Sequence, residues 1–90
     1  DRMINITDVK IRRLLHDGRL RAIVSVTLDD AIALHDIKVI EGPNRLFVAM
    51  PSRRDDNGVY RDIVHPISSQ ERNAIEDRIL SCYQSSLAAQ

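Results

Sequence analysis

The sequence contains one cysteine, three glycines, three aromatic residues and no tryptophan, and each shortage excludes a class of protein. A single cysteine, Cys82, cannot form an intrachain disulfide, so we expect a reducing compartment and a cytoplasmic location. The glycines never cluster, which excludes a phosphate-binding loop of the GxGxxG or P-loop kind. No apolar run approaches the roughly 18 residues of a membrane span, so we expect no membrane partner.

Net charge is also absent, because 13 Lys and Arg residues balance 13 Asp and Glu residues. A neutral chain lacks the overall positive charge of many nucleic-acid-binding proteins, so such a function would need an uneven distribution of charge.

The 90 residues predict a single domain over residues 1–90, with the composition of a soluble globular protein. Met3 is a candidate for the natural start, with residue 1 as the alternative. Residues 85–90 are expected to fray.

β-branched residues are abundant, with 11 isoleucines and 7 valines against 8 leucines, which favours sheet. Residues 20–28 alternate in the way typical of a strand with one face in the core. A first strand changes phase near Asp8, which predicts a β-bulge, and its apolar residues are Ile4, Ile6, Val9 and Ile11. Three further strands are expected at residues 32–40, 46–50 and 59–64.

The connections between these strands are too short for a parallel crossover, so we predict an antiparallel meander of about five strands. Ser68 and Glu71 form a capping-box pattern that predicts the start of a helix. An apolar stripe follows at helical spacing, and it contains Ile75, Ile79, Cys82 and Tyr83. The fold class is therefore α+β with one C-terminal amphipathic helix, in which Arg72 and Glu76 are expected to pair on the outer side.

A single helix of about 18 residues cannot cover both faces of a five-stranded sheet. The second face, or an edge of the sheet, would then remain open to solvent. Another copy of the chain would cover it most simply, because most soluble oligomers are symmetric dimers. We therefore predict a homodimer that forms through the sheet.

Residues that could carry catalysis do not form a recognisable constellation. The histidines have no metal-ligand spacing, and we expect structural or solvated roles for His16, His35 and His65. Cys82 lies on the apolar helix stripe, as a small buried thiol would. A Gly-x-Ser-x-Gly nucleophile motif is missing. We therefore expect no enzyme, no metal, no cofactor and no small-molecule substrate.

Charge is segregated along the chain. The net charge alternates in sign over four segments, namely +3 for residues 1–28, −3 for 29–44, +2 for 45–61 and −2 for 62–90. Of the 13 cations, 11 are arginines, whose planar guanidinium suits bidentate contact with phosphate. A GC-rich genome or surface salt bridges would produce the same count, so the arginine excess permits a nucleic-acid partner without requiring one.

Two pairs of adjacent arginines are candidates for phosphate contact. Arg12 and Arg13 end the first strand, where only one of the two can face a groove. Arg53 and Arg54 lie in a predicted loop after Pro51, where both can reach phosphates. With only three aromatic residues, the chain offers no stacking platform for unpaired bases. Duplex DNA, or RNA bound through its backbone, is therefore the better match.

Five blocks of sequence carry a recognisable pattern, and two of them, LFVAMPSRR and RDIVHPI, are distinctive. The blocks are TDVKIRR from Thr7, RAIVSVTLDD from Arg21, HDIKVIEG from His35, LFVAMPSRR from Leu46 and YRDIVHPISS from Tyr60. In order and spacing, from about Ile4 to Tyr83, the chain resembles the stage V sporulation protein G (SpoVG) family. The resemblance implies a bacterial cytoplasmic regulator of septation and sporulation that binds DNA, and in some members RNA, as a homodimer.

The family has a basic pair directly after its Met-Pro-Ser turn, which corresponds to Arg53 and Arg54 and makes them the first candidates for nucleic-acid contact. Arg12 and Arg13 come second, and Arg72 in the first helical turn comes third. Acidic residues 55 and 56 follow the pair where the family more often has uncharged residues, so weaker contacts are expected. The alternative function is a protein–protein interaction module in cell division or transcription control that does not bind nucleic acid.

Overall fold

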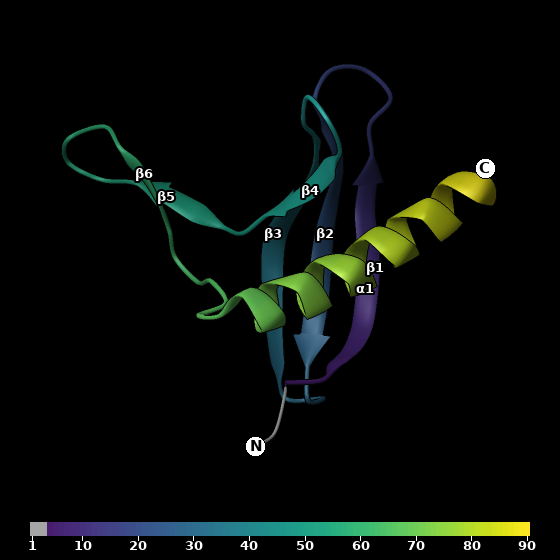
Figure 1. The fold of residues 1–90 in the computed structure, drawn as a ribbon, viewed down its shortest axis with the longest axis horizontal. Helices are drawn as coiled ribbons and strands as arrows, with labels where there is room; N and C mark the ends of the chain where they lie inside the picture. Colours follow the sequence, from purple (N-terminus) through teal and green to yellow (C-terminus); the bar gives the residue numbers. More distant parts are fainter. Residues whose placement is uncertain (1–3) are drawn as a thin grey trace.

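Four antiparallel strands form the main sheet, and a separate two-stranded hairpin and one helix complete the fold (Figure 1). The computed structural model describes residues 4–90, so the candidate start at Met3 lies outside the described residues. The elements are β1 (Ile6–Leu14), β2 (Leu20–Leu28), β3 (Ile32–Glu41), β4 (Leu46–Ala49), β5 (Ser52–Arg54), β6 (Tyr60–Asp62) and α1 (Ser69–Ala88). The predicted α+β class and the C-terminal helix are confirmed.

The main sheet follows the predicted meander, with strand order β1-β2-β3-β4. β2 occupies the predicted residues because its period-two alternation turns every second side chain toward the core, and Ala22, Val24 and Val26 are buried there. The predicted β-bulge near Asp8 is confirmed, since the pairing of β1 with β2 shifts register between Ile6 and Asp8.

The fifth predicted strand does not extend the main sheet. Its centre forms β6, which pairs with β5 in a two-stranded sheet of its own. Pro51 separates β4 from β5, and a proline lacks the N–H group that would continue the hydrogen-bond ladder of β4. Residues 52–62, which we call the arm, project from the main sheet and from α1 (Figure 1).

The helix begins where the capping pattern predicts. The Ser68 side chain accepts a hydrogen bond from the Glu71 backbone N–H at 3.1 Å. α1 has 20 residues and extends to Ala88, and the fraying of residues 85–90 stays a prediction. The apolar stripe lies against the sheet, with Ile79 and Tyr83 buried in the core.

One helical contact differs from the sequence prediction. Glu76 does not pair with Arg72 on the outer side, because its side chain points to the sheet and is only 10% exposed. Its carboxylate accepts a hydrogen bond from the Val48 N–H of β4 at 3.0 Å, and Arg45 Nη1 lies 3.3 Å from its other oxygen. Glu76 therefore attaches the helix to β4, which is an edge strand of the main sheet.

Candidate nucleic-acid interface

The arm presents the first candidate pair on a hairpin. Arg53 is the cross-strand partner of Arg61, and Arg54 is the partner of Tyr60. Successive strand residues point to opposite faces, so Arg53 and Arg54 lie on opposite faces of the arm. The prediction that both arginines lie in a loop is wrong, because β5 and β6 pair directly after Pro51. The long side chains of both arginines nevertheless border one shallow concavity of about 350 Å³ along the arm, which is also lined by Arg61 and by the carboxylates of Asp55, Asp56 and Asp62.

The acidic residue after the pair has a structural role in the turn of the arm. Asp55 accepts hydrogen bonds from Arg61 Nε at 2.8 Å and from the backbone N–H groups of Asn57 and Val59 at 2.9 and 3.0 Å. The Arg61 guanidinium, and then the two backbone N–H groups, hold the pKa of Asp55 below its ordinary value. The carboxylate therefore engages Arg61 and not the two candidate arginines.

Arg54 lies against the turn of the arm at Gly58. This glycine has φ of +81°, and a Cβ built on it would lie 3.2 Å from Arg54 Nη2. The guanidinium thus covers a position where a side chain would be both strained and in close contact with it. Together with the Asp55 turn, this contact gives the arm a defined shape although the arm is exposed.

Arg12 and Arg13 lie on the face of the main sheet turned away from α1, which we call the outer face. The residues on either side of them, Ile11 and Leu14, both pack against the core. The pairing of β1 with β2 shifts register between Ile11 and Arg13, and this second β-bulge turns both arginines outward. The prediction that only one of the pair can face a groove is therefore wrong.

Ion pairs occupy other arginines than the predicted contacts. In residues 4–90 the ion-paired arginines are Arg21 with Glu41, Arg45 with Glu76 and Arg61 with Asp55. Within the same residues, none of the five predicted contact arginines has such a partner. All five are exposed, including Arg72, which lies on α1 and so on the opposite side of the sheet from Arg12 and Arg13. Surface salt bridges therefore do not explain why arginines occupy these five positions.

Ser25 is a site residue that the sequence did not reveal. It lies between the core residues Val24 and Val26, so it points to the outer face, where it is nevertheless only 6% exposed. Its hydroxyl lies 3.1 Å from Arg12 Nε and 2.9 Å from His35 Nδ1. A serine within an apolar strand is the only sequence signal, and that signal does not identify its partners.

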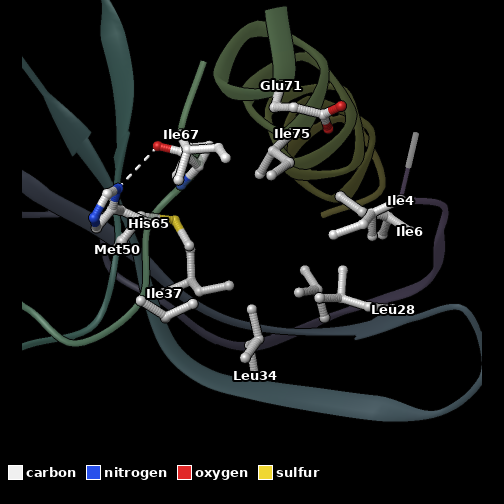
Figure 2. A pocket seen from close by; sticks show the side chains of 13 residues that line it. Ile4, Ile6, Leu28, Leu34, Ile37, Met50, His65, Ile67, Glu71 and Ile75 are labelled. Carbon is white, nitrogen blue, oxygen red and sulfur yellow. Dashed lines mark hydrogen bonds between the residues drawn. The ribbon is translucent and has the colours of Figure 1, made fainter. Parts of the chain in front are cut away.

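An apolar cavity lies between the start of α1 and the sheet (Figure 2). Its volume is about 390 Å³, and its floor includes Leu28, Leu34 and Ile37 from β2 and β3. Ile4 and Ile67 border it and are 52% and 91% exposed. His65, which also borders it, hydrogen-bonds through Nδ1 to the Pro66 carbonyl at 2.9 Å (Figure 2).

The described part of the chain, residues 4–90, has no group of three or more His, Cys, Asp or Glu residues arranged to hold a metal ion. In the same part of the chain, no helix combines the length and the apolar character that crossing a bilayer requires.

Comparison with known proteins identifies the family. Residues 4–85 match the model of the SpoVG family. The chain is 54% identical over 87 residues to "Putative septation protein SpoVG" of Desulforudis audaxviator, covering 97% of this chain and 99% of that protein. Proteins of the same name from Lachnospira eligens and Staphylococcus aureus are 51% identical over 81 residues and 50% identical over 80 residues. These alignments cover 90% and 89% of this chain, and 92% and 80% of the relatives. The chain therefore belongs to the SpoVG family.

Proposed function

We propose that this protein is a cytoplasmic regulator of septation and gene expression that binds the backbone of duplex DNA, or of RNA, as a homodimer. The observation that carries the proposal is the arm, whose Arg53 and Arg54 are exposed and have no ion-pair partner among residues 4–90. Arginines in this state are free to contact phosphate. The septation role rests on the names of the relatives.

The zero net charge constrains this proposal. The chain as a whole does not attract nucleic acid, so binding depends on local groups of arginines and falls steeply with salt.

No catalytic step is proposed. The Ser25–His35 pair has the atoms of a nucleophile and a base, but the serine is nearly buried beside Arg12 and so has little access to a substrate.

Replacing Arg53 and Arg54 together with alanine is expected to weaken the binding of a short duplex DNA and to flatten its salt dependence. Each lost phosphate contact lowers the slope of log K against log salt by about 0.9, so the double change lowers it by about 1.8. Between about 50 and 200 mM salt, the wild type is therefore expected to lose about tenfold more affinity than the double variant loses. Fluorescence anisotropy with a labelled duplex at several salt concentrations measures both quantities.

The matched control is the double change Arg19→Ala with Arg78→Ala, which removes the same charge from exposed positions outside the arm. It is expected to leave the slope nearly unchanged. An unchanged slope for Arg53→Ala with Arg54→Ala contradicts the proposal. Absence of binding to duplex DNA and to RNA at low salt, together with a copurifying protein partner, would favour the protein-interaction alternative.

The homodimer is proposed from the apolar cavity and its rim. A second copy that covers Ile4 and Ile67 would remove two large exposed side chains from water at the cavity. Because the floor of the cavity is formed by β2 and β3, such a dimer forms partly through the sheet. It also leaves the charged outer face open.

The change Ile67→Asp is expected to weaken dimerisation at least about tenfold, because a carboxylate would be placed in an apolar interface. Ile67 is 91% exposed in the single chain, so the fold itself is not expected to lose stability. Sedimentation equilibrium measures the dissociation constant. The control Ile32→Asp changes another exposed isoleucine that does not line the cavity, and equal weakening by both changes would refute this interface.

A further inference from the structure

Three neighbouring strands bring polar side chains together at one point of the outer face. Ser25 stands in the middle of β2, with Arg12 on β1 and His35 on β3. Arg12 Nε and His35 Nδ1 both lie within hydrogen-bond distance of the same oxygen, Ser25 Oγ, at 3.1 and 2.9 Å. The guanidinium and the imidazole are therefore within two hydrogen-bond lengths of each other.

Two β-bulges produce this convergence. On one side, the register shift between Ile11 and Arg13 makes Arg12 the extra residue of β1. On the other side, β2 and β3 shift register between Val24 and Val26, opposite His35 and Asp36. Asp36 has φ of 63°, a left-handed conformation that aspartate tolerates better than most residues. Bulges of this kind redirect side chains and are frequent beside functional sites.

The polar atoms that remain are donors of the kind that bind anions. Ser25 engages only Nε of Arg12, and within residues 4–90 the two terminal nitrogens of Arg12 have no hydrogen-bond or ion-pair partner. Because the Ser25 hydroxyl accepts from Arg12 Nε, it can donate its own proton to His35 Nδ1. The neutral ring then carries its proton on Nε2, which has no hydrogen-bond partner among residues 4–90. Lys10 is the cross-strand partner of Ser25 and so shares the outer face.

Nearby carboxylates do not neutralise these groups. Asp8 lies on β1 and Asp36 on β3, and among the described residues neither forms an ion pair with Arg12 or Lys10. Ser25 itself is nearly buried, so its role is to orient its two neighbours and not to bind directly. The hydroxyl thus acts as a positioning group for two exposed donors.

We propose that Arg12 and His35, oriented by Ser25, form a binding site for one phosphate group of a nucleic-acid backbone on the outer face of the sheet. Arginine and polar side chains supply most phosphate contacts in protein–nucleic-acid interfaces, and a guanidinium held at Nε presents its terminal nitrogens to a phosphate. The inference rests on the proposed nucleic-acid binding and adds a second contact region to the arm. Nucleic acid bound at both regions would cross the outer face.

The test compares Arg12→Ala, Ser25→Ala and the control Arg78→Ala in the duplex DNA titration. Arg12→Ala is expected to lower the salt slope by about 0.9, while Arg78→Ala, on the opposite side of the sheet, leaves it nearly unchanged. Ser25→Ala removes no charge, so we expect the salt slope to stay nearly unchanged and the affinity at a fixed salt concentration to fall about threefold, the size of one lost neutral hydrogen bond. A purely electrostatic role for Arg12 would not be affected by Ser25→Ala.

A second readout uses inorganic phosphate as the probe. Side-chain ¹⁵N resonances of Arg12 Nε and of the His35 ring are expected to shift on titration in the wild type, and to shift much less in Ser25→Ala. Normal duplex binding and slope in Arg12→Ala, with weakened binding in the Arg53→Ala, Arg54→Ala variant, would overturn this site and leave the proposed function intact. Absent duplex binding by the wild type would overturn the proposed function, and unshifted resonances would independently overturn the site. Circular dichroism confirms that each variant folds.

Discussion

Replacing Ile79 with alanine is expected to lower the free energy of unfolding by about 2–5 kcal/mol. The side chain is completely buried in the core between α1 and the main sheet, so the change removes buried methyl and methylene groups and leaves a cavity. A domain of this size is stable by about 5–15 kcal/mol, so the loss is a large part of the total. Urea unfolding followed by circular dichroism measures it.

The control is Ile67→Ala, at an isoleucine that is 91% exposed. At protein concentrations low enough to keep the chain monomeric, Ile67→Ala is expected to change the free energy of unfolding by no more than about 0.5 kcal/mol. A loss of less than about 1 kcal/mol for Ile79→Ala would mean that α1 is not packed on the sheet as described, because even smaller core truncations usually cost this much. The comparison therefore tests the packing that separates the helix-covered face from the outer face.

Local signals explain why much of the fold was predictable from the sequence. The alternation in residues 20–28 specifies a strand without reference to its neighbours, and β2 has those bounds. The cap at Ser68 needs only the residue three positions later, and the structure contains that hydrogen bond. The bulge near Asp8 was visible as a change of phase in the apolar residues.

The features that were not predictable depend on pairing between segments. Nothing local to Arg12 or Asp36 marks them as bulge residues, because a bulge exists only relative to the partner strand. The arm likewise forms because β6 pairs with β5 and not with β4, and the sequence pattern around residues 59–64 does not specify which strand is the partner. For Glu76, helical spacing suggested Arg72 as a partner, but burial against β4 determined the actual partners.

These differences change the expected arrangement of both arginine pairs. From the sequence, only one arginine of the Arg12–Arg13 pair was expected to face a groove, whereas the second bulge exposes both on the outer face. The arm separates Arg53 and Arg54 onto opposite faces. The exposed arginines thus form two groups, one on a sheet face and one on a hairpin. A neutral protein can in this way present local positive charge.

The strand that leads into the arm is held by Glu76, and replacing this residue with alanine is expected to lower the free energy of unfolding by about 1–3 kcal/mol. The change leaves the Val48 N–H of the edge strand β4 without its acceptor at 3.0 Å and removes the partner of Arg45. Urea unfolding measures the loss. Hydrogen exchange of the Val48 amide reports on β4 directly and is expected to become faster.

Two further variants separate the hydrogen bond of Glu76 from its charge. Glu76→Gln keeps an oxygen that can accept from Val48 and loses only the ion pair with Arg45, whose side chain is 66% exposed. Solvent around the Arg45 guanidinium screens this pair although Glu76 itself is buried, so we expect the glutamine variant to retain most of the stability. Asp77→Ala, at the exposed neighbouring acid, controls for the loss of a helix carboxylate. If Glu76→Ala were no more destabilising than Asp77→Ala, the attachment of α1 to β4 would not depend on this carboxylate, and the arm would have to be held in place by the core alone.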